Sequence, residues 1–200
     1  MHWSALLHLG DPPLTLAAAA AIAAWLAAAR AWRMAFWWSA VFAAGIGLVA
    51  ASKIGFLAYG SPLPALNFRT ISGHATGVTA IAPTLIYLLL QHAGRRARVI
   101  GFCAGLAIGA AMALLLVATY QHSIAEAIAG LAMGATVSLS AIALGGAVPP
   151  LRAPAGLATA CLAFALALWI VRPLPLGYIM YRLSRLLTHN ATTLALYAGC

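Results

Sequence analysis

A histidine and a glutamate four residues apart form the pair in this sequence best suited to chemistry. His122 and Glu126 lie in the stretch Tyr-Gln-His-Ser-Ile-Ala-Glu, which covers residues 120–126. On a helix these two side chains share one face and can touch. A carboxylate beside an imidazole fixes its tautomer and stabilises its protonated form, which leaves the other ring nitrogen free to attack or to take up a proton. The alternative is that Glu126 pairs with an arginine and only joins two helices.

A second group of polar residues lies upstream, where Ser72, Gly73 and His74 precede a long apolar run. If a helix starts there, its free backbone N–H groups and the positive end of its dipole favour an anion such as phosphate. Lys53 and Arg69 add cationic groups suited to phosphate oxygens. Simpler roles remain open, because a histidine at a helix start is often only a cap and a cation at the end of a membrane span often only reaches toward water.

The scarcity of acidic residues narrows this chemistry. Asp11 and Glu126 are the only two in the chain. Phosphoryl transfer that depends on Mg²⁺ needs several carboxylates to hold the ion, so we predict no metal and no other cofactor. A zinc site made of His74, His122 and Glu126 is numerically possible, but the four-residue spacing better matches an orienting pair. The residues therefore favour metal-free phosphoryl transfer to a histidine nucleophile, with a second histidine as the acid.

The composition predicts an integral membrane protein. Of the 200 residues 64% are hydrophobic and only 6% are charged, whereas an ordinary soluble domain carries about 25% charged residues. The formal net charge of +9 comes from basic residues that lie singly or in short clusters between apolar runs. This pattern is typical of membrane topology, and we predict no nucleic-acid partner.

Apolar runs predict an all-α fold, a polytopic bundle of six transmembrane helices. A spanning helix needs roughly 17–25 mostly apolar residues. The runs that qualify cover approximately residues 12–29, 34–52, 75–91, 99–119, 124–148 and 154–171. The bundle then forms one domain over residues 1–173, followed by a C-terminal tail over 174–200. Basic residues interrupt the apolar residues of the tail, so an interfacial helix is expected there rather than a seventh span.

The arginines in the short connections predict the orientation of the bundle. Three connections, between spans one and two, three and four, and five and six, carry six arginines, and positive charge gathers on the cytoplasmic side. They are Arg30, Arg33, Arg95, Arg96, Arg98 and Arg152. The candidate site residues fall on the opposite face, although Arg172, Arg182 and Arg185 argue against this assignment. The alanine-rich composition suggests a bacterial inner membrane, with the site facing the periplasm or the exterior.

These motifs resemble the type 2 phosphatidic acid phosphatase superfamily, integral-membrane lipid phosphatases related to vanadium haloperoxidases. The family pattern reads Lys-x6-Arg-Pro, then Pro-Ser-Gly-His, then Ser-Arg-x5-His-x3-Asp. The resemblance covers roughly residues 53–130, and the matching positions are Lys53, Ser72, Gly73, His74 and His122, with Glu126 in place of the aspartate. The departures are Gly60 and Ser61 for Arg-Pro, Ile71 for the proline, and Leu115 and Leu116 for Ser-Arg.

The resemblance implies a role for each matching residue. His122 would be the nucleophile that forms a phosphohistidine, Glu126 would orient it, and His74 would protonate the leaving lipid oxygen. Phosphate binding would fall to Lys53, Ser72 and the Gly73 amide. Two family arginines are missing, and as a separate hypothesis Arg69 replaces one of them from a different position.

The leading expectation is therefore an enzyme, a lipid phosphate phosphatase with its site on the non-cytoplasmic face. Its substrate would be a membrane lipid phosphate, and isoprenoid carrier diphosphates, phosphatidate and phosphatidylglycerophosphate all fit. A degenerate family member that binds phospholipid headgroups without turnover is the first alternative, favoured by the missing arginines. A small transporter is the second, and it would place its polar residues at the membrane midplane.

Overall fold

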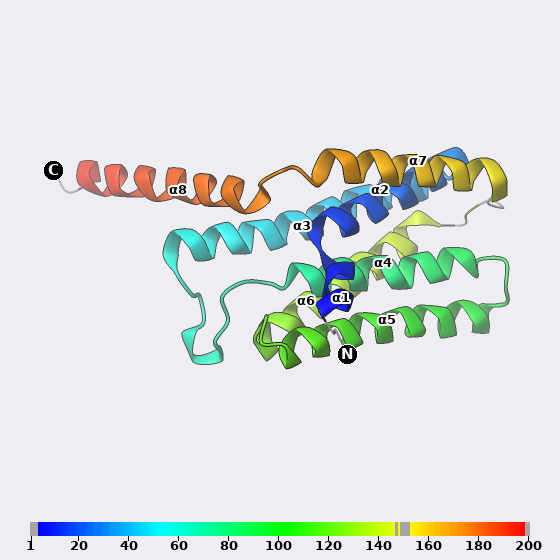
Figure 1. Cartoon of the computed structure of the whole chain (residues 1–200), viewed down its shortest axis with the longest axis horizontal. Coiled ribbons are helices and arrows are strands. Elements are labelled where there is room, and N and C mark those ends of the chain that lie inside the picture. The colour runs from blue at the N-terminus through cyan, green and yellow to red at the C-terminus, as the bar shows by residue number, and fades with distance from the viewer. Residues whose placement is uncertain (1–3, 147, 149–152, 199–200) are drawn as a thin grey trace.

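A computed structural model describes the backbone of residues 4–146, 148 and 153–198, and the side chains of 6–146, 148 and 156–188. This part of the chain is helical and contains no β-strand, only one isolated bridge between Leu63 and Phe68. The all-α expectation is therefore confirmed (Figure 1). The α-helices are α1 (Ser4–Leu7), α2 (Pro12–Ala28), α3 (Trp32–Tyr59), α4 (Gly73–Leu89), α5 (Arg95–Ala118), α6 (Ile124–Gly145), α7 (Ala153–Val171) and α8 (Leu176–Ala198), and the 3-10 turns are η1 (His8–Gly10) and η2 (Pro64–Leu66).

Helices occupy all six of the predicted apolar segments, but the structure does not establish six membrane spans. Only α3, α5 and α6 are long and apolar enough to cross a membrane, and α7 with α8 passes the same criterion as one pair bent by 55°. Both α2 and α4 have 17 residues. A helix of that length rises about 26 Å, a few ångströms less than the hydrocarbon core of a bilayer. By length and composition, the described part of the chain thus holds three candidate spans, or four with the bent pair.

Helix α3 is longer than predicted. It continues past Lys53 as far as Tyr59, seven residues beyond the expected end of the second span. The chain leaves the helix at Gly60, whose φ of 86° is a conformation that glycine adopts without steric cost. A helix end is set by such a cap and by hydrogen bonding, so one lysine within a mostly apolar stretch did not end it.

Helix α4 packs against α2, α5 and α6. Glycines of α5 and α6 allow these close approaches, as their small-x-x-x-small spacing predicts. An added Cβ at Gly105 would overlap the backbone of Pro83, and one at Gly130 would lie 2.6 Å from the carbonyl oxygen of Ser72. The second contact brings the N-terminal ends of α4 and α6 together, and these are the ends that carry His74 and Glu126.

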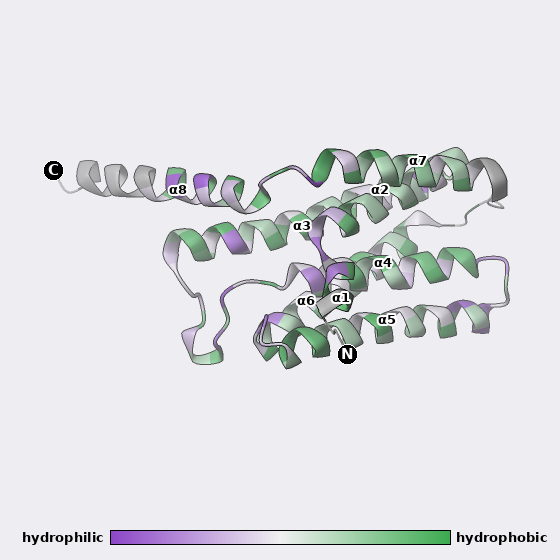
Figure 2. Ribbon diagram, viewed as in Figure 1, coloured by the Kyte–Doolittle hydropathy of each residue, from purple (hydrophilic) through white to green (hydrophobic). Residues whose placement is uncertain are grey.

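The arginines at the start of α5 lie at the opposite end of the bundle from His122 (Figure 1). The α4–α5 connection, which leads to Arg95, lies at one end of the bundle, and the α5–α6 connection, which carries His122, lies at the other (Figure 1). Hydrophilic residues occur in such connections and in the described part of α8, whereas most residues of the other helices are apolar (Figure 2). This distribution is compatible with a membrane protein. Arg152 lies outside the described residues.

The C-terminal tail forms α8, which follows α7 after the 55° bend and packs against α3. Helix α7 ends at Val171 and α8 begins at Leu176. The division into a domain over residues 1–173 and a tail over 174–200 stays a prediction. Arg182 and Arg185 are exposed on α8, together with large apolar side chains such as Leu183 and Leu186. Its placement at a membrane interface stays a prediction.

Candidate functional site

Glu126 helps to begin α6 as part of a capping box. The N-cap residue Ser123 accepts a hydrogen bond at its Oγ from the Glu126 backbone N–H at 3.3 Å, and the Ser123 backbone N–H donates to Glu126 Oε2 at 3.0 Å. Such reciprocal bonds satisfy two donors that the first turn of a helix leaves unpaired. The Ser-x-x-Glu pattern at 123–126 is a readable sequence signal for this cap, and the sequence analysis did not use it.

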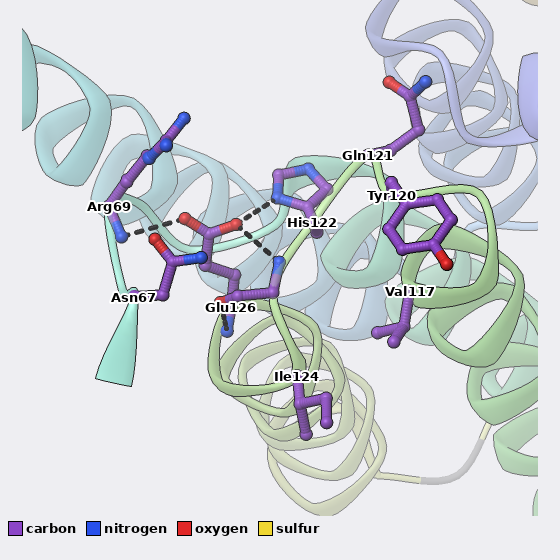
Figure 3. A pocket seen from close by; sticks show the side chains of 9 residues that line it. Asn67, Arg69, Val117, Tyr120, Gln121, His122, Ile124 and Glu126 are labelled. Atoms are coloured by element: carbon purple, nitrogen blue, oxygen red, sulfur yellow. Dashed lines mark hydrogen bonds and ion pairs between the residues drawn. The ribbon is translucent and has the colours of Figure 1, made fainter. Parts of the chain in front are cut away.

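The same carboxylate holds His122. Its Oε2 accepts a hydrogen bond from His122 Nδ1 at 2.8 Å, and its Oε1 accepts one from the backbone N–H of Arg69 at 2.8 Å (Figure 3). The same Oε1 also accepts from the backbone N–H of Thr70 at 3.2 Å. Glu126 is only 5% exposed. An ionised carboxylate accepts only, so Nδ1 of His122 carries a proton, and in the neutral ring Nε2 is the nitrogen with the lone pair. The four-residue spacing thus produces the contact expected of an orienting pair.

An arginine does not neutralise this carboxylate. The Arg69 guanidinium points away from Glu126, which takes only the Arg69 backbone (Figure 3). Among the described side chains, the ion pairs found are those between histidines and the two acids. The simple helix-joining alternative for Glu126 therefore does not describe what the side chain contacts, although its bonds to residues 69 and 70 do tie the segment before α4 to α6.

Ser72 is the N-cap of α4. Its Oγ accepts from the Ala75 backbone N–H at 3.4 Å, and its own backbone N–H donates to the carbonyl oxygen of Glu126 at 3.2 Å. The residue is fully buried, so its side chain lies inside the packing between α4 and α6. Gly73, the first residue of the helix, is partly exposed, and an added Cβ there would meet only Val49 at an ordinary 3.5 Å.

His74 is held by Asp11, which the sequence analysis did not select. Asp11 Oδ1 lies 3.0 Å from His74 Nε2, and Oδ2 lies 2.9 Å from His8 Nδ1. Burial alone would raise the pKa of Asp11, but the hydrogen bonds with His8 and His74 outweigh it and hold that pKa below its usual value. No local pattern links residues 11 and 74. The available signal was the scarcity of acids, since each one must have a reason to lie in so apolar a chain.

The two histidines line one cavity of about 360 Å³. His74 and His122 contribute to its wall together with Leu7, His8, Asp11, Leu116 and Gln121. A second cavity of about 330 Å³ also has His122 in its wall, and its lining includes Asn67, Arg69, Tyr120 and Glu126. His122 and Gln121 therefore border both cavities.

Of the two predicted phosphate-binding cations, one lines a cavity and the other does not. Arg69 is exposed and lines the second cavity. Lys53 is exposed on α3 and lines neither cavity, although its neighbour Ser52 accepts a hydrogen bond from the Ile71 backbone N–H at 3.1 Å. Leu116, which stands where the resembling family has an arginine, is buried at the wall of the first cavity. Within the described residues, no three His, Cys, Asp or Glu side chains are grouped to hold a metal ion.

Comparison with known proteins gives one informative similarity. The chain is 30% identical over 139 residues to an uncharacterized 22.5 kDa protein in the cps region of Klebsiella pneumoniae. The alignment covers 69% of this chain and 66% of that relative, slightly less than two thirds of its length. No family model matches the chain, and no solved structure matches it.

Proposed function

We propose that this protein is a membrane lipid phosphatase that hydrolyses a lipid phosphate or diphosphate through a phosphohistidine intermediate. The observation that carries the proposal is that His74 and His122 line one cavity while each is hydrogen-bonded to a carboxylate. A nucleophile held by a third group and an acid on the same cavity is the arrangement that covalent catalysis needs. The resemblance of Ser72-Gly73-His74 and His122 to the lipid phosphatase motifs supports the same reaction.

The first step forms the intermediate. His122 Nε2 attacks the phosphorus atom, and the bond between phosphorus and the lipid oxygen breaks. The electron pair of that bond goes to the leaving oxygen, which takes a proton from Nδ1 of the His74 imidazolium. Glu126 keeps Nδ1 of His122 protonated and balances the positive charge that develops on the ring.

The second step releases phosphate. Neutral His74 takes a proton from water, whose oxygen attacks phosphorus as the bond between phosphorus and His122 Nε2 breaks. The electron pair of that bond returns to the His122 ring, and the acid form of His74 is regenerated. Both steps use only side chains of this chain, and both of its carboxylates are already hydrogen-bonded to histidines. The proposed reaction is therefore independent of divalent metal ions.

The charge of the phosphate would be met from two sides. Gly73 and His74 occupy the first turn of α4, where backbone N–H groups have no partner inside the helix and the dipole favours an anion. Arg69 lines the adjoining cavity and has its side chain free to turn toward a phosphate oxygen. A guanidinium beside a transferring phosphoryl group stabilises its transition state.

We further propose that the helices α2 to α7 form six membrane spans, with the site at the periplasmic or exterior face of a bacterial inner membrane. Both 17-residue helices reach the lower limit of a spanning length. Arginines at the α2–α3 and α4–α5 connections support a cytoplasmic location for the end opposite His122. A site near the end of a bundle suits a lipid headgroup, whose phosphate lies at the membrane surface.

The test is phosphate release from a panel of lipid phosphates by the purified protein in detergent. The panel contains an isoprenoid diphosphate, phosphatidate and phosphatidylglycerophosphate, each assayed with wild type and with His122→Ala. We expect release from at least one lipid by the wild type and none by the variant. Trapping of ³²P on the protein, stable to alkali and labile to acid, would identify the phosphohistidine. Turnover that survives in His122→Ala would refute the mechanism.

Binding without turnover is a second candidate. Leu116 lines the histidine cavity where the lipid phosphatase family has an arginine, and Lys53 does not line it, so the lining of this cavity contains no lysine or arginine. It predicts no phosphate release from any lipid of the panel, but binding to vesicles that contain phosphatidate at the same affinity with or without His122.

A further inference from the structure

The N-terminal segment forms part of the wall around His74. The turn η1 covers His8–Gly10, and Asp11 closes it by donating its backbone N–H to the carbonyl oxygen of His8 at 3.1 Å. Leu7, His8 and Asp11 then line the same cavity as the two histidines. Leu9, Gly10 and Asp11 also look like the residues before the first span in members of the lipid phosphatase family, but none of the three motifs assigns this segment a role.

The His74 ring packs directly against Gly10. It is buried, and a Cβ added to it would lie 2.9 Å from both Cβ and Cδ2 of His74. These separations are shorter than van der Waals contact, so any side chain at position 10 would displace the ring. Gly10 has no positive φ, so the need for glycine here comes from space and not from backbone conformation.

Asp11 fixes the ring from its Nε2 side. Its carboxylate bridges His74 and the more exposed His8, with one oxygen for each ring. The His74 side chain is 29% exposed and that of Asp11 is 39% exposed. A pair this accessible to water contributes little to stability, about 0–1 kcal/mol. What the contact does determine is the direction of the ring: with Nε2 hydrogen-bonded to Asp11, Nδ1 is the ring nitrogen left to donate a proton to a substrate.

We propose that Asp11 is a positioning residue that holds His74 as the proton donor to the leaving group, and that Gly10 leaves the space that the His74 ring occupies. This inference rests on the proposed phosphatase function. Each of the two histidines is then held by one carboxylate: Asp11 orients His74, and Glu126 orients His122. The proposal also makes the segment before α2 a part of the catalytic site and not only the connection that precedes this helix.

The dependence of the rate on the leaving group tests this role. The full-length protein in detergent is assayed on octyl phosphate, whose alkoxide needs a proton to leave, and on p-nitrophenyl phosphate, whose phenolate leaves without one. General-acid help is typically worth about 10²–10⁴-fold. The second step also uses His74 and is common to both substrates, so the comparison uses kcat/KM, which reports only the steps up to departure of the alcohol or phenol. We expect Asp11→Ala to lower kcat/KM on octyl phosphate by about 10²-fold or more, and to leave kcat/KM on p-nitrophenyl phosphate within about tenfold of the wild type.

Companion variants separate positioning from folding. Asp11→Asn keeps the shape and one acceptor oxygen but loses the charge, so its loss on octyl phosphate should lie between those of the wild type and Asp11→Ala. Gly10→Ala should reproduce the selective loss, since the added methyl group displaces the ring while Asp11 stays. Leu9→Ala is the matched control, because Leu9 is exposed on the same turn and lines neither cavity. Equal losses of kcat/KM on both substrates in Asp11→Ala would overturn the positioning role.

A second measurement does not depend on turnover. In protein labelled with ¹⁵N-histidine, two-bond ¹H–¹⁵N correlations report which ring nitrogen carries the proton. We expect His74 to carry it on Nε2 in the wild type and to exchange between tautomers in Asp11→Ala. An unchanged His74 signal in the variant would overturn the inference even if the wild type hydrolyses lipids. Conversely, a wild type that releases phosphate from neither of these substrates nor from any lipid of the panel refutes the proposed function, while this spectrum still decides whether Asp11 holds the ring.

Discussion

Replacement of Glu126 by glutamine is the sharpest test of the nucleophile. Both oxygens of the carboxylate accept hydrogen bonds, one from Arg69 and Thr70 and the other from His122 and Ser123. Glutamine offers one acceptor oxygen and one NH₂ donor, so it satisfies only one of these two sets. If the oxygen stays with residues 69 and 70, the NH₂ group faces His122 Nδ1. The ring must then move its proton to Nε2, and the attacking nitrogen loses its lone pair.

The structure sets the expected magnitude for Glu126→Gln. A wrong histidine tautomer in a comparable catalytic pair costs about 10⁴-fold in kcat. Glutamine can also turn its oxygen toward His122 and leave residues 69 and 70 unpaired, so we expect a loss of about 10²–10⁴ in kcat. The donor left without an acceptor in this buried place should cost about 1–3 kcal/mol of stability. Glu126→Asp should be milder in kcat, since it keeps the charge and restores the aspartate of the resembling family.

The assay must separate the catalytic loss from the loss of stability. Phosphate release is measured at substrate saturation, beside thermal unfolding of the same preparation in detergent. Ser123→Ala is the matched control, because it removes the N-cap oxygen of α6, at a cost of about 1 kcal/mol, and leaves the contact between His122 and Glu126 in place. We expect this control to keep most of its turnover. Glu126→Gln with the wild-type kcat would refute the orienting role of the carboxylate.

Three further predictions concern the metal, the phosphate and the packing. Turnover should survive EDTA, and complete loss that Mg²⁺ or Zn²⁺ restores would contradict the metal-free mechanism. Arg69→Ala should lower kcat/KM by about tenfold or more because a phosphate contact is lost. Lys53→Ala should have the smaller effect in the same kinetic assay, because the Lys53 side chain lines neither cavity. The opposite order of effects would favour the family pattern over the observed geometry. Gly105→Leu should destabilise the fold by about 1–3 kcal/mol or more in thermal unfolding, because its Cβ overlaps the backbone of Pro83, while Gly47→Leu, with open space around it, should not.

The sequence predicts most of the helices because their signal is local. Each apolar run has a composition that favours a helix, and the structure has helices in all six runs. The number of membrane spans does not follow from this signal, since α2 and α4 stop at 17 residues where capping and turns end them. The extension of α3 past Lys53 escaped prediction for the same reason, because Gly60, not the first charge, ends the helix.

The site divides in the same way between local and distant contacts. The pairing of His122 with Glu126 follows from a four-residue spacing on one helix face. The burial of Ser72 and the exposure of Lys53 depend instead on how α3, α4 and α6 pack, which no spacing within one segment determines. The contact between Asp11 and His74 joins residues 63 positions apart, so it becomes visible only when α2 and α4 lie side by side.

The two acidic residues differ in how much the fold depends on their hydrogen bonds. Glu126 starts α6, ties down the backbone of residues 69 and 70, and holds His122, so any replacement disturbs all three at once. Asp11 is more exposed and bonds only to two histidine side chains through its carboxylate. Its replacement should therefore leave the bundle largely unchanged and act mainly on His74. This difference makes Asp11 the cleaner position from which to learn whether the cavity performs acid catalysis, and Glu126 the position where loss of activity must always be read beside loss of stability.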